Sequence, residues 1–396
     1  MRYLFRKQQG NHSSSSHLAV RLPEIVAHIL SYLAASIPHD DNHRQYKNTC
    51  GYLYPCLFVN HLWHDCAQRL LWRHVLFDDT KADYEAFLRF VSSVVNSLPP
   101  PRLSTTAAAA AALAVAVPIP KPRSNINYMA EVNAQYKPDH CIEQAKRIRV
   151  DRYRHAIRSL TLRKIKETNI SEPLEALGRY LPRLERLDMY ICDYVTNETL
   201  QRFISFGKLT YISLAGCFRV TDDAILKVAQ YCRDLEHLDL RACGMVSDVS
   251  IAAIATCCPR LRHLNVGRIR DRERISIQSI GLIAVYTQVA VLGLAGCNID
   301  DECMTMLAKH RNAGLERISV NHCHRLTNKS IRAFVRYCCN MTVFEMKECH
   351  CINDWESVAE LVQRKVLLTL CDQQNRACTE WAKRKGRTMD VKAPSK

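Results

Sequence analysis

The chain has 396 residues and a formal net charge of +16, with 47% apolar and 24% charged residues. These proportions and a mean hydropathy of −0.19 exclude a wholly disordered chain and a polytopic membrane protein, and the length exceeds one ordinary domain. The longest apolar stretch, Ala107–Val117, is shorter than the roughly 20 residues that a membrane-spanning helix needs.

The N-terminal residues 1–17 are polar and serine-rich, and we expect them to be disordered. They lack the apolar core of a secretory signal, so we expect the protein in the cytoplasm and nucleus. In those reducing compartments the 19 cysteines, an odd number, are expected to remain free thiols rather than to form a disulfide framework.

Residues 18–91 are predicted to form a small all-α module. A first helix over Leu22–Leu33 has proline near its start and apolar residues at helical spacing. A second helix spans Cys56–Ala67, and Leu70–Arg73 follows it. Between the two helices lies a polar, histidine-containing insertion at 37–52.

A proline-led helix, a helix with valine and tryptophan four residues apart (Val59 and Trp63) and a closing Leu-Trp-Arg resemble an F-box. The resemblance implies that the module docks on a Skp adaptor through an apolar patch made of Leu22, Pro23, Ile25, Ile29, Leu33, Val59 and Trp63. The insertion and the proline-to-glutamate spacing depart from the F-box pattern. An ordinary helical capping domain, in which Trp63 is only a core residue, is the alternative.

Residues 92–140 have the composition of a linker, with the proline run 99–101, the alanine run 107–112 and three further prolines. So few bulky apolar side chains cannot form a core, and we expect this segment to be disordered. A helix over Ile142–His155 is expected to cap the domain that follows.

Residues 141–363 contain a repeat of about eight coils. Its template, L-x-x-L-x-L, begins at Leu184, Leu209, Leu235, Leu261, Val289, Leu315 and Met341, with spacings of 25, 26, 26, 28, 26 and 26, and an earlier coil begins at Ile157. A period near 26 and this template are typical of leucine-rich repeats. The predicted fold class is therefore α/β: a solenoid with parallel strands on its concave face and helices on its convex face, preceded by the all-α module.

A helix is predicted after each strand, because apolar residues then recur at helical spacing. A side chain able to cap the first free amides precedes each of these helices: Thr221, Ser247, Ser276, Asp300, Thr327 and Asn353.

Cysteine recurs at one phase of the repeat, three residues after the last apolar residue of the strand: Cys192, Cys217, Cys243, Cys297, Cys323 and Cys349. No pair of cysteines has the C-x-x-C spacing of a structural zinc site, although Cys349-His-Cys351 and His322-Cys-His324 are suggestive. We therefore expect no metal and no cofactor, and a ladder of small buried thiols instead. The pattern resembles the cysteine-containing class of leucine-rich repeats.

Residues 364–396 are predicted to form a C-terminal helix and a basic tail that includes Lys383–Arg387. Such a cluster serves nuclear import or nucleic-acid contact, or is simply a solvated tail. The sequence leaves these interpretations open.

An F-box followed by cysteine-type leucine-rich repeats resembles a substrate-receptor subunit of a Skp–cullin–F-box (SCF) ubiquitin ligase, and more narrowly the fungal antagonist-of-mitotic-exit family. The resemblance implies partners, namely the Skp adaptor, a cullin and a protein target destined for ubiquitin-dependent degradation in cell-cycle control. The chain itself would not be an enzyme, and it contains no hydrolase, phosphate-loop or zinc-protease motif.

Two other functions are compatible with the sequence. A scaffold without ligase activity could sequester a signalling protein such as a mitotic-exit GTPase. Nucleic-acid binding through the arginines at 268, 270, 272 and 274 is less favoured, because Asp271 and Glu273 alternate with them. No contact with a membrane is expected.

The target is expected on the concave face, where alternate strand residues point. The candidate target-binding residues are Arg186, Tyr190, Tyr211, His237, Asp239, Arg241, His263, Asn265, Arg268, Arg317 and Asn321. Val291, Gly293 and Ala295 are small and predict an apolar dip between polar neighbours. A target side chain entering this dip would be flanked by Arg241, Arg268 and Arg317, which suits an acidic or phosphorylated segment.

Overall fold

The computed structural model describes residues 21–33, 51–78, 81–95 and 138–394, with side chains from residue 143 onward in the last range. The chain divides into two compact units, 1–74 and 75–396, and each is described by itself. The expected disordered N-terminus at 1–17 and most of the insertion at 37–52 lie outside the described residues.

The first unit is a small helical module. Its described elements are α1 (Pro23–Ser31), the 3-10 turns η2 (Gly51–Leu53) and η3 (Pro55–Phe58), and α3 (His61–Leu71). Asn60 caps α3 by accepting a hydrogen bond from the Trp63 backbone amide at 3.0 Å. The core of the module contains Val26, Leu30, Leu53, Cys56, Cys66 and Ala67, and Leu62, Trp63 and Leu70 pack around it.

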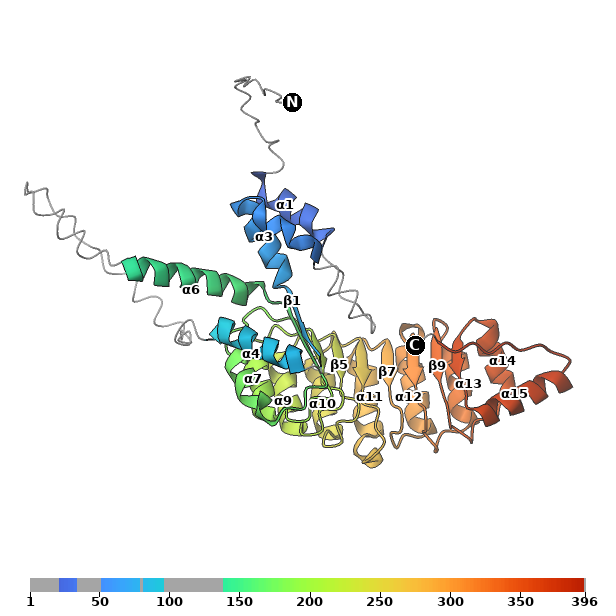
Figure 1. Ribbon diagram of the computed structural model, residues 1–396. Helices are drawn as coiled ribbons and strands as arrows, with labels where there is room; N and C mark the ends of the chain where they lie inside the picture. Colours follow the sequence, from blue (N-terminus) through green and yellow to red (C-terminus); the bar gives the residue numbers. More distant parts are fainter. Residues whose placement is uncertain (1–20, 34–50, 79–80, 96–137, 395–396) are drawn as a thin grey trace, which may run out of the picture. The chain divides into compact units, whose positions relative to one another are not determined.

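The second unit contains one sheet of ten strands in chain order, of which β2–β10 pair in parallel (Figure 1). The strands are β1 (His74–Phe77), β2 (Ser159–Arg163), β3 (Arg186–Tyr190), β4 (Tyr211–Ser213), β5 (His237–Asp239), β6 (His263–Asn265), β7 (Val291–Gly293), β8 (Arg317–Ser319), β9 (Val343–Glu345) and β10 (Leu367–Thr369). Each strand lies beside its sequence neighbour, so one coil contacts only the next.

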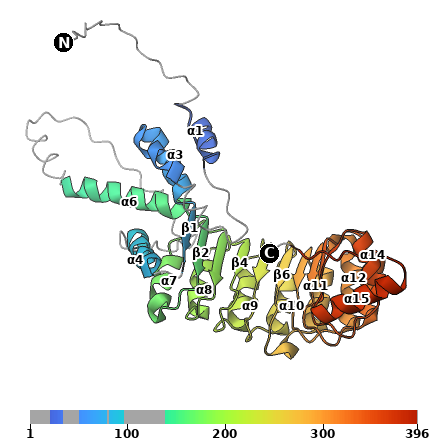
Figure 2. The same ribbon diagram turned by 45° about the vertical axis from the view of Figure 1, so that its right-hand side comes forward.

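Helices follow the strands and cover one face of the sheet (Figure 2). They are α4 (Lys81–Val95), α7 (Ser171–Gly178), α8 (Asn197–Ile204), α9 (Asp222–Tyr231), α10 (Asp248–Cys257), α11 (Ile277–Tyr286), α12 (Asp301–Arg311), α13 (Asn328–Tyr337), α14 (Trp355–Gln363) and α15 (Asp372–Arg384). A further helix, α6 (Pro138–Ala156), precedes β2 and projects from this end of the array. Short 3-10 turns complete the coils at η4 (Thr168–Ile170), η5 (Arg272–Arg274) and η6 (Asn312–Gly314). The template apolar residues of the strands are buried between sheet and helices, for example Leu235, Leu238 and Leu240. The predicted leucine-rich-repeat fold is confirmed.

The cysteine ladder is confirmed as a packing and hydrogen-bonding element. Each buried thiol is directed at the carbonyl oxygen of the last inward strand residue of the preceding coil, as Cys243 Sγ is at the Leu214 oxygen at 3.1 Å and Cys349 Sγ at the Val320 oxygen at 3.0 Å. Burial raises the pKa of Cys243 to about 12, so this thiol stays protonated and can donate. The ladder therefore ties adjacent coils together at the end of each strand.

A second ladder ties the helix N-termini together. Asp301, the first residue of α12, accepts hydrogen bonds from the Thr327 amide at 2.9 Å, the Thr327 hydroxyl at 2.6 Å and the Ser330 hydroxyl at 2.5 Å. Asp222 and Asp248 make equivalent bonds to the coils that follow them. The expected caps Thr221, Ser247, Ser276, Asp300 and Thr327 are confirmed, but α14 is capped by Asp354 rather than by Asn353. The Asn353 amide is instead held by Asn328 of the preceding coil.

The chain turns through a left-handed residue after most strands, at Ile191, Ala242, His322 and Glu348 among others. Gly296 occupies this position with φ of +71°, and a Cβ atom there would lie 1.9 Å from the Arg268 carbonyl oxygen. Glycine is therefore required at this corner, both by its conformation and by the close approach of the preceding coil.

The boundaries of the repeat unit differ from the predicted ones. The helical module does not extend to residue 91, because β1 joins the sheet and α4 packs on α7 with Phe87 and Val94 fully buried. Residues 92–95 end α4 and 138–140 begin α6, so the expected disordered linker is shorter than 92–140, and residues 96–137 lie outside the described part. The predicted helix at 142–155 is the longer α6.

The array also continues beyond residue 363. β10 pairs with β9, and the Leu368 amide donates to the Lys392 carbonyl oxygen at 2.8 Å. The tail thus lies along the last strand, where it occupies a backbone donor at the edge of the sheet. Within the described residues, no helix has both the length and the apolar character needed to cross a bilayer.

Candidate functional site

The exposed face of the sheet carries its side chains in rows, because the strands pair in register. The first row runs through Arg186, Tyr211, His237, His263, Val291 and Arg317, and the second through Asp188, Ser213, Asp239, Asn265, Gly293 and Ser319. The inward leucines lie between them. A third row continues past the strand ends and includes Tyr190, Arg241 and Asn321. The candidate target-binding residues therefore share this face, except Arg268.

Four residues of the first row form a continuous stack. The Arg186 guanidinium lies 3.3 Å from the centre of the Tyr211 ring, and the rings of Tyr211, His237 and His263 follow at 3.9 Å each. The stack ends at Val291, which has no ring. These side chains are held by one another, so they present a preorganised surface to a partner.

Burial lowers the pKa of His263 to about 4, while Asp239 acts in the opposite direction and Arg241 and Arg317 lower it further. The imidazole is therefore neutral at physiological pH. A neutral ring stacks on its neighbours without requiring a counter-charge.

We expect this histidine to make the protein acid-sensitive. Its folded pKa lies below the ordinary 6.5, so the unfolded chain binds the proton first, and stability falls as the pH decreases from about 6.5 to about 4. The slope is at most about 1.4 kcal/mol per pH unit for one proton. Urea unfolding at pH 7 and pH 5 should show a smaller loss for His263→Phe than for the unmodified protein. The exposed His324→Phe should lose as much as the unmodified protein, and equal losses for all three would contradict the assignment.

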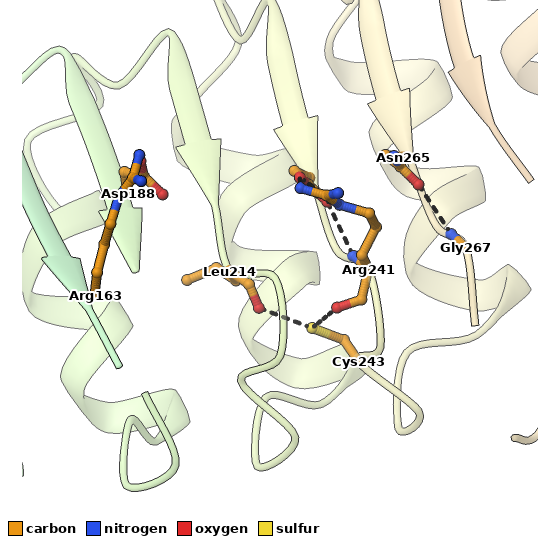
Figure 3. A network of polar contacts seen from close by, with 8 residues as sticks. Arg163, Asp188, Leu214, Arg241, Cys243, Asn265 and Gly267 are labelled. Carbon is orange, nitrogen blue, oxygen red and sulfur yellow. Dashed lines mark hydrogen bonds and ion pairs between the residues drawn. The ribbon is translucent and has the colours of Figure 1, made fainter. Parts of the chain in front are cut away.

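The two carboxylates of the second row are buried. Asp239 is 5% exposed and accepts from the Arg241 amide at 3.0 Å and from the Arg241 side chain at 2.7 Å. Asp188 is 7% exposed, with Arg163 at 3.8 Å, and burial raises its pKa (Figure 3). Asp239 therefore positions Arg241, which is the more exposed of the two side chains.

Arg317 and Asn321 belong to a second polar group on the face. Arg317 pairs with Glu345 at 2.6 Å, and Asn321 accepts from the Lys347 amide at 2.7 Å. Arg241 and Arg317 remain about half exposed. An acidic target would meet both guanidinium groups from the solvent side.

Two expectations about this face are wrong. The dip at the fifth repeat strand is filled, because a Cβ on Gly293 would lie only 2.3 Å from the Asn265 Cγ, so the Asn265 side chain covers the glycine. Arg268 is 4% exposed and points into the coil, where it donates to the carbonyl oxygens of Val266 at 3.2 Å and Val246 at 3.0 Å. It cannot flank a target on the concave face.

The expected adaptor patch is exposed on the helical module. Leu22, Pro23, Ile25, Ile29 and Leu33, in or beside α1, are exposed, while Val26 and Leu30 of the helix are buried. Val59 is exposed too, but Trp63 is half-buried against the core of the module. Sequence reasoning missed Phe58, which is 86% exposed and directly precedes Val59. The predicted helix over Cys56–Ala67 included Phe58, whereas α3 begins at His61.

One group of side chains in the described part could hold a metal ion. Potential ligand atoms of Glu348, His350 and Cys371 lie within 4.8 Å of one another, and His350 pairs with Glu348 at 3.0 Å. Cys371 also has a structural role, because it is the N-cap residue of α15. A zinc assay on Cys371→Ser would therefore show whether these residues bind metal.

A direct test of the thiol ladder is Cys243→Ser. The serine hydroxyl is shorter and more strongly hydrated than the thiol, so we expect the free energy of unfolding to drop by about 1–3 kcal/mol. Cys339→Ser, at an exposed thiol of the same array, should leave it unchanged. Urea denaturation measures both, and equal effects would show that the ladder position is not special.

No known family profile matches the sequence. The chain is 31% identical over 393 residues to Antagonist of mitotic exit network protein 1 of Yarrowia lipolytica, covering 89% of this chain and 52% of that protein. It is 33% identical over 164 residues to the protein of the same name from Saccharomyces cerevisiae, covering 41% of this chain and 30% of that one. The chain thus spans about half or less of the length of these relatives.

Solved structures with some likeness include the Rad7 and Elc1 complex in yeast, with 15% identity, 56% of each chain covered and a TM-score of 0.45. An internalin C2 from Listeria monocytogenes follows, with 17% identity, 56% of this chain and 84% of that one covered, and a TM-score of 0.39.

Proposed function

We propose that the chain is a member of the antagonist-of-mitotic-exit family that acts as the substrate receptor of a Skp–cullin–F-box ubiquitin ligase. The helical module acts as the F-box and docks on the Skp adaptor, and the repeat array binds a protein target for ubiquitin-dependent degradation in mitotic-exit control. The chain itself performs no catalysis, and it works in the cytoplasm and nucleus.

The observation that carries this proposal is the apolar face of α1. Leu22, Ile25, Ile29 and Leu33, in or directly beside this short helix, are all about 40% exposed. A contiguous exposed apolar surface on a small module marks a binding site for another protein. The F-box resemblance of the same residues supplies the partner.

The decisive experiment is reconstitution. The full chain, a Skp adaptor and a cullin are co-expressed, and we expect the three to co-elute as one complex with one copy of each. A chain that elutes alone while remaining folded by circular dichroism would overturn the ligase proposal. That result would favour the scaffold, in which the array binds and sequesters a signalling protein without ubiquitin transfer.

A further inference from the structure

In the coil that follows β6, a charged side chain is buried and an apolar side chain is exposed. After β6 the loop 267–275 is two residues longer than its counterparts, as the spacing of 28 indicates. Where the other coils bury a cysteine, this loop buries Arg268 at 4% exposure and leaves Ile269 84% exposed. A charged side chain is thus inside and an apolar one outside.

The buried arginine is held but not fully satisfied. Its guanidinium donates to the carbonyl oxygens of Val246 at 3.0 Å and Asp271 at 3.4 Å, and among the described residues its Nη2 is buried with no hydrogen-bond partner. Burying an unpaired donor and exposing an isoleucine both disfavour folding. Such local violations concentrate where a protein binds something.

The exposed isoleucine does not lie alone. Phe218 and Met245, in the corresponding loops of the two preceding coils, are 49% and 50% exposed. Backbone hydrogen bonds link the three loops, from Gly216 to Arg241 at 2.8 Å and from Ala242 to Gly267 at 2.9 Å. We call Phe218, Met245 and Ile269 the apolar ridge, which follows the carboxyl ends of β4, β5 and β6.

Three arginines in the loops of the apolar ridge lack a carboxylate partner among the described residues. Within the described residues, Arg219, Arg270 and Arg274 form no ion pair, and Arg219 instead lies over the Tyr194 ring at 4.7 Å. Two exposed arginines of later coils do pair with acids, Arg325 with Asp300 at 3.3 Å and Arg332 with Asp354 at 2.6 Å. The loop after β6 carries four arginines against two acids, Asp271 and Glu273. The ridge therefore combines exposed apolar side chains with an excess of positive charge.

We infer that the apolar ridge and its arginines dock an acidic segment of a protein partner, which covers Ile269 with an apolar side chain and pairs its carboxylates with Arg219, Arg270 and Arg274. Aromatic residues, methionine and arginine, the types found here, are enriched in protein interfaces. The inference rests on the proposed function, since it gives the chemistry of the target. It also places the expected acidic target at the carboxyl ends of β4, β5 and β6, instead of at Gly293, where Asn265 fills the predicted dip.

The test uses the full chain and a fluorescein-labelled synthetic peptide that alternates leucine with glutamate pairs. Anisotropy should show saturable binding, and Met245→Asp with Ile269→Asp should weaken it at least tenfold, about 1.4 kcal/mol. Val249→Asp with Val285→Asp, at exposed valines on the convex helices α10 and α11, is the matched control and should bind normally. A peptide with lysine in place of glutamate should not bind.

Three outcomes would overturn the inference: no binding by the unmodified chain, equal loss in both variant pairs, or ridge-dependent binding to phosphatidylserine vesicles without binding to the peptide. The vesicle result would assign the ridge to a membrane surface. Adaptor co-elution is measured on the same variants. It is expected to be normal in all of them, so failure of this inference is distinguishable from failure of the ligase proposal.

Discussion

Replacing Ile25 and Ile29 with aspartate is expected to abolish binding to the Skp adaptor. Both side chains lie on the exposed face of α1 and are not part of the buried core of the module. Each buried isoleucine contributes about 1.5–3 kcal/mol to an interface, and a carboxylate there would also lose its water. Together the changes should weaken the complex by roughly 100-fold or more, measured by titration of labelled adaptor.

The same helix supplies the control. Ala27 and Ser31 lie two positions from the mutated residues, hence on another side of α1, and both are exposed. Ala27→Asp with Ser31→Asp adds the same charge to the same helix and should leave adaptor affinity unchanged. If both pairs lose binding together, the effect comes from the added charge or from unfolding of α1, and the apolar face is not the docking surface.

Asp301→Ala is expected to be among the most destabilising single substitutions of a polar residue in the array. The carboxylate accepts three hydrogen bonds from the following coil. Its loss would leave the hydroxyl of Ser330, which is fully buried, without this acceptor. Hydrogen bonds to a charged group contribute about 1.5–3 kcal/mol, and an unsatisfied buried donor costs about 1–3 kcal/mol. We expect the free energy of unfolding to fall by roughly 2–4 kcal/mol in urea denaturation.

The neighbouring Glu302 is exposed, and Glu302→Ala should change stability little. The hydrogen bonds from Ser330 and Thr327 hold the pKa of Asp301 below its ordinary value, although burial opposes them. A depressed carboxyl pKa contributes stability above the unfolded pKa that is lost as the pH falls through the folded one. The difference between the unmodified protein and Asp301→Ala should therefore shrink in acid, and a difference independent of pH would contradict the role of the carboxylate.

The sequence by itself determined the repeat and its fold. Leucines at L-x-x-L-x-L can be buried only if coils stack, so the period of the apolar residues predicted parallel strands in chain order and a helix after each strand. The six ladder cysteines and five of the six expected helix caps followed from the same phase, because both are local to one coil. The exposed face of α1 could also be read from its helical spacing.

The tertiary structure decided what depends on contacts between coils. Only the neighbouring strand shows that Asn265 covers Gly293 and removes the expected dip. Only the packing of the longer loop shows that Arg268 turns inward and Ile269 outward, since a count of residues after the strand places an isoleucine at the cysteine position. The addition of β1 and α4 to the repeat array likewise depends on tertiary contacts, because β1 pairs with β2 and α4 packs on α7. Residues 96–137 separate these partners in the sequence, so no local pattern predicts their contact.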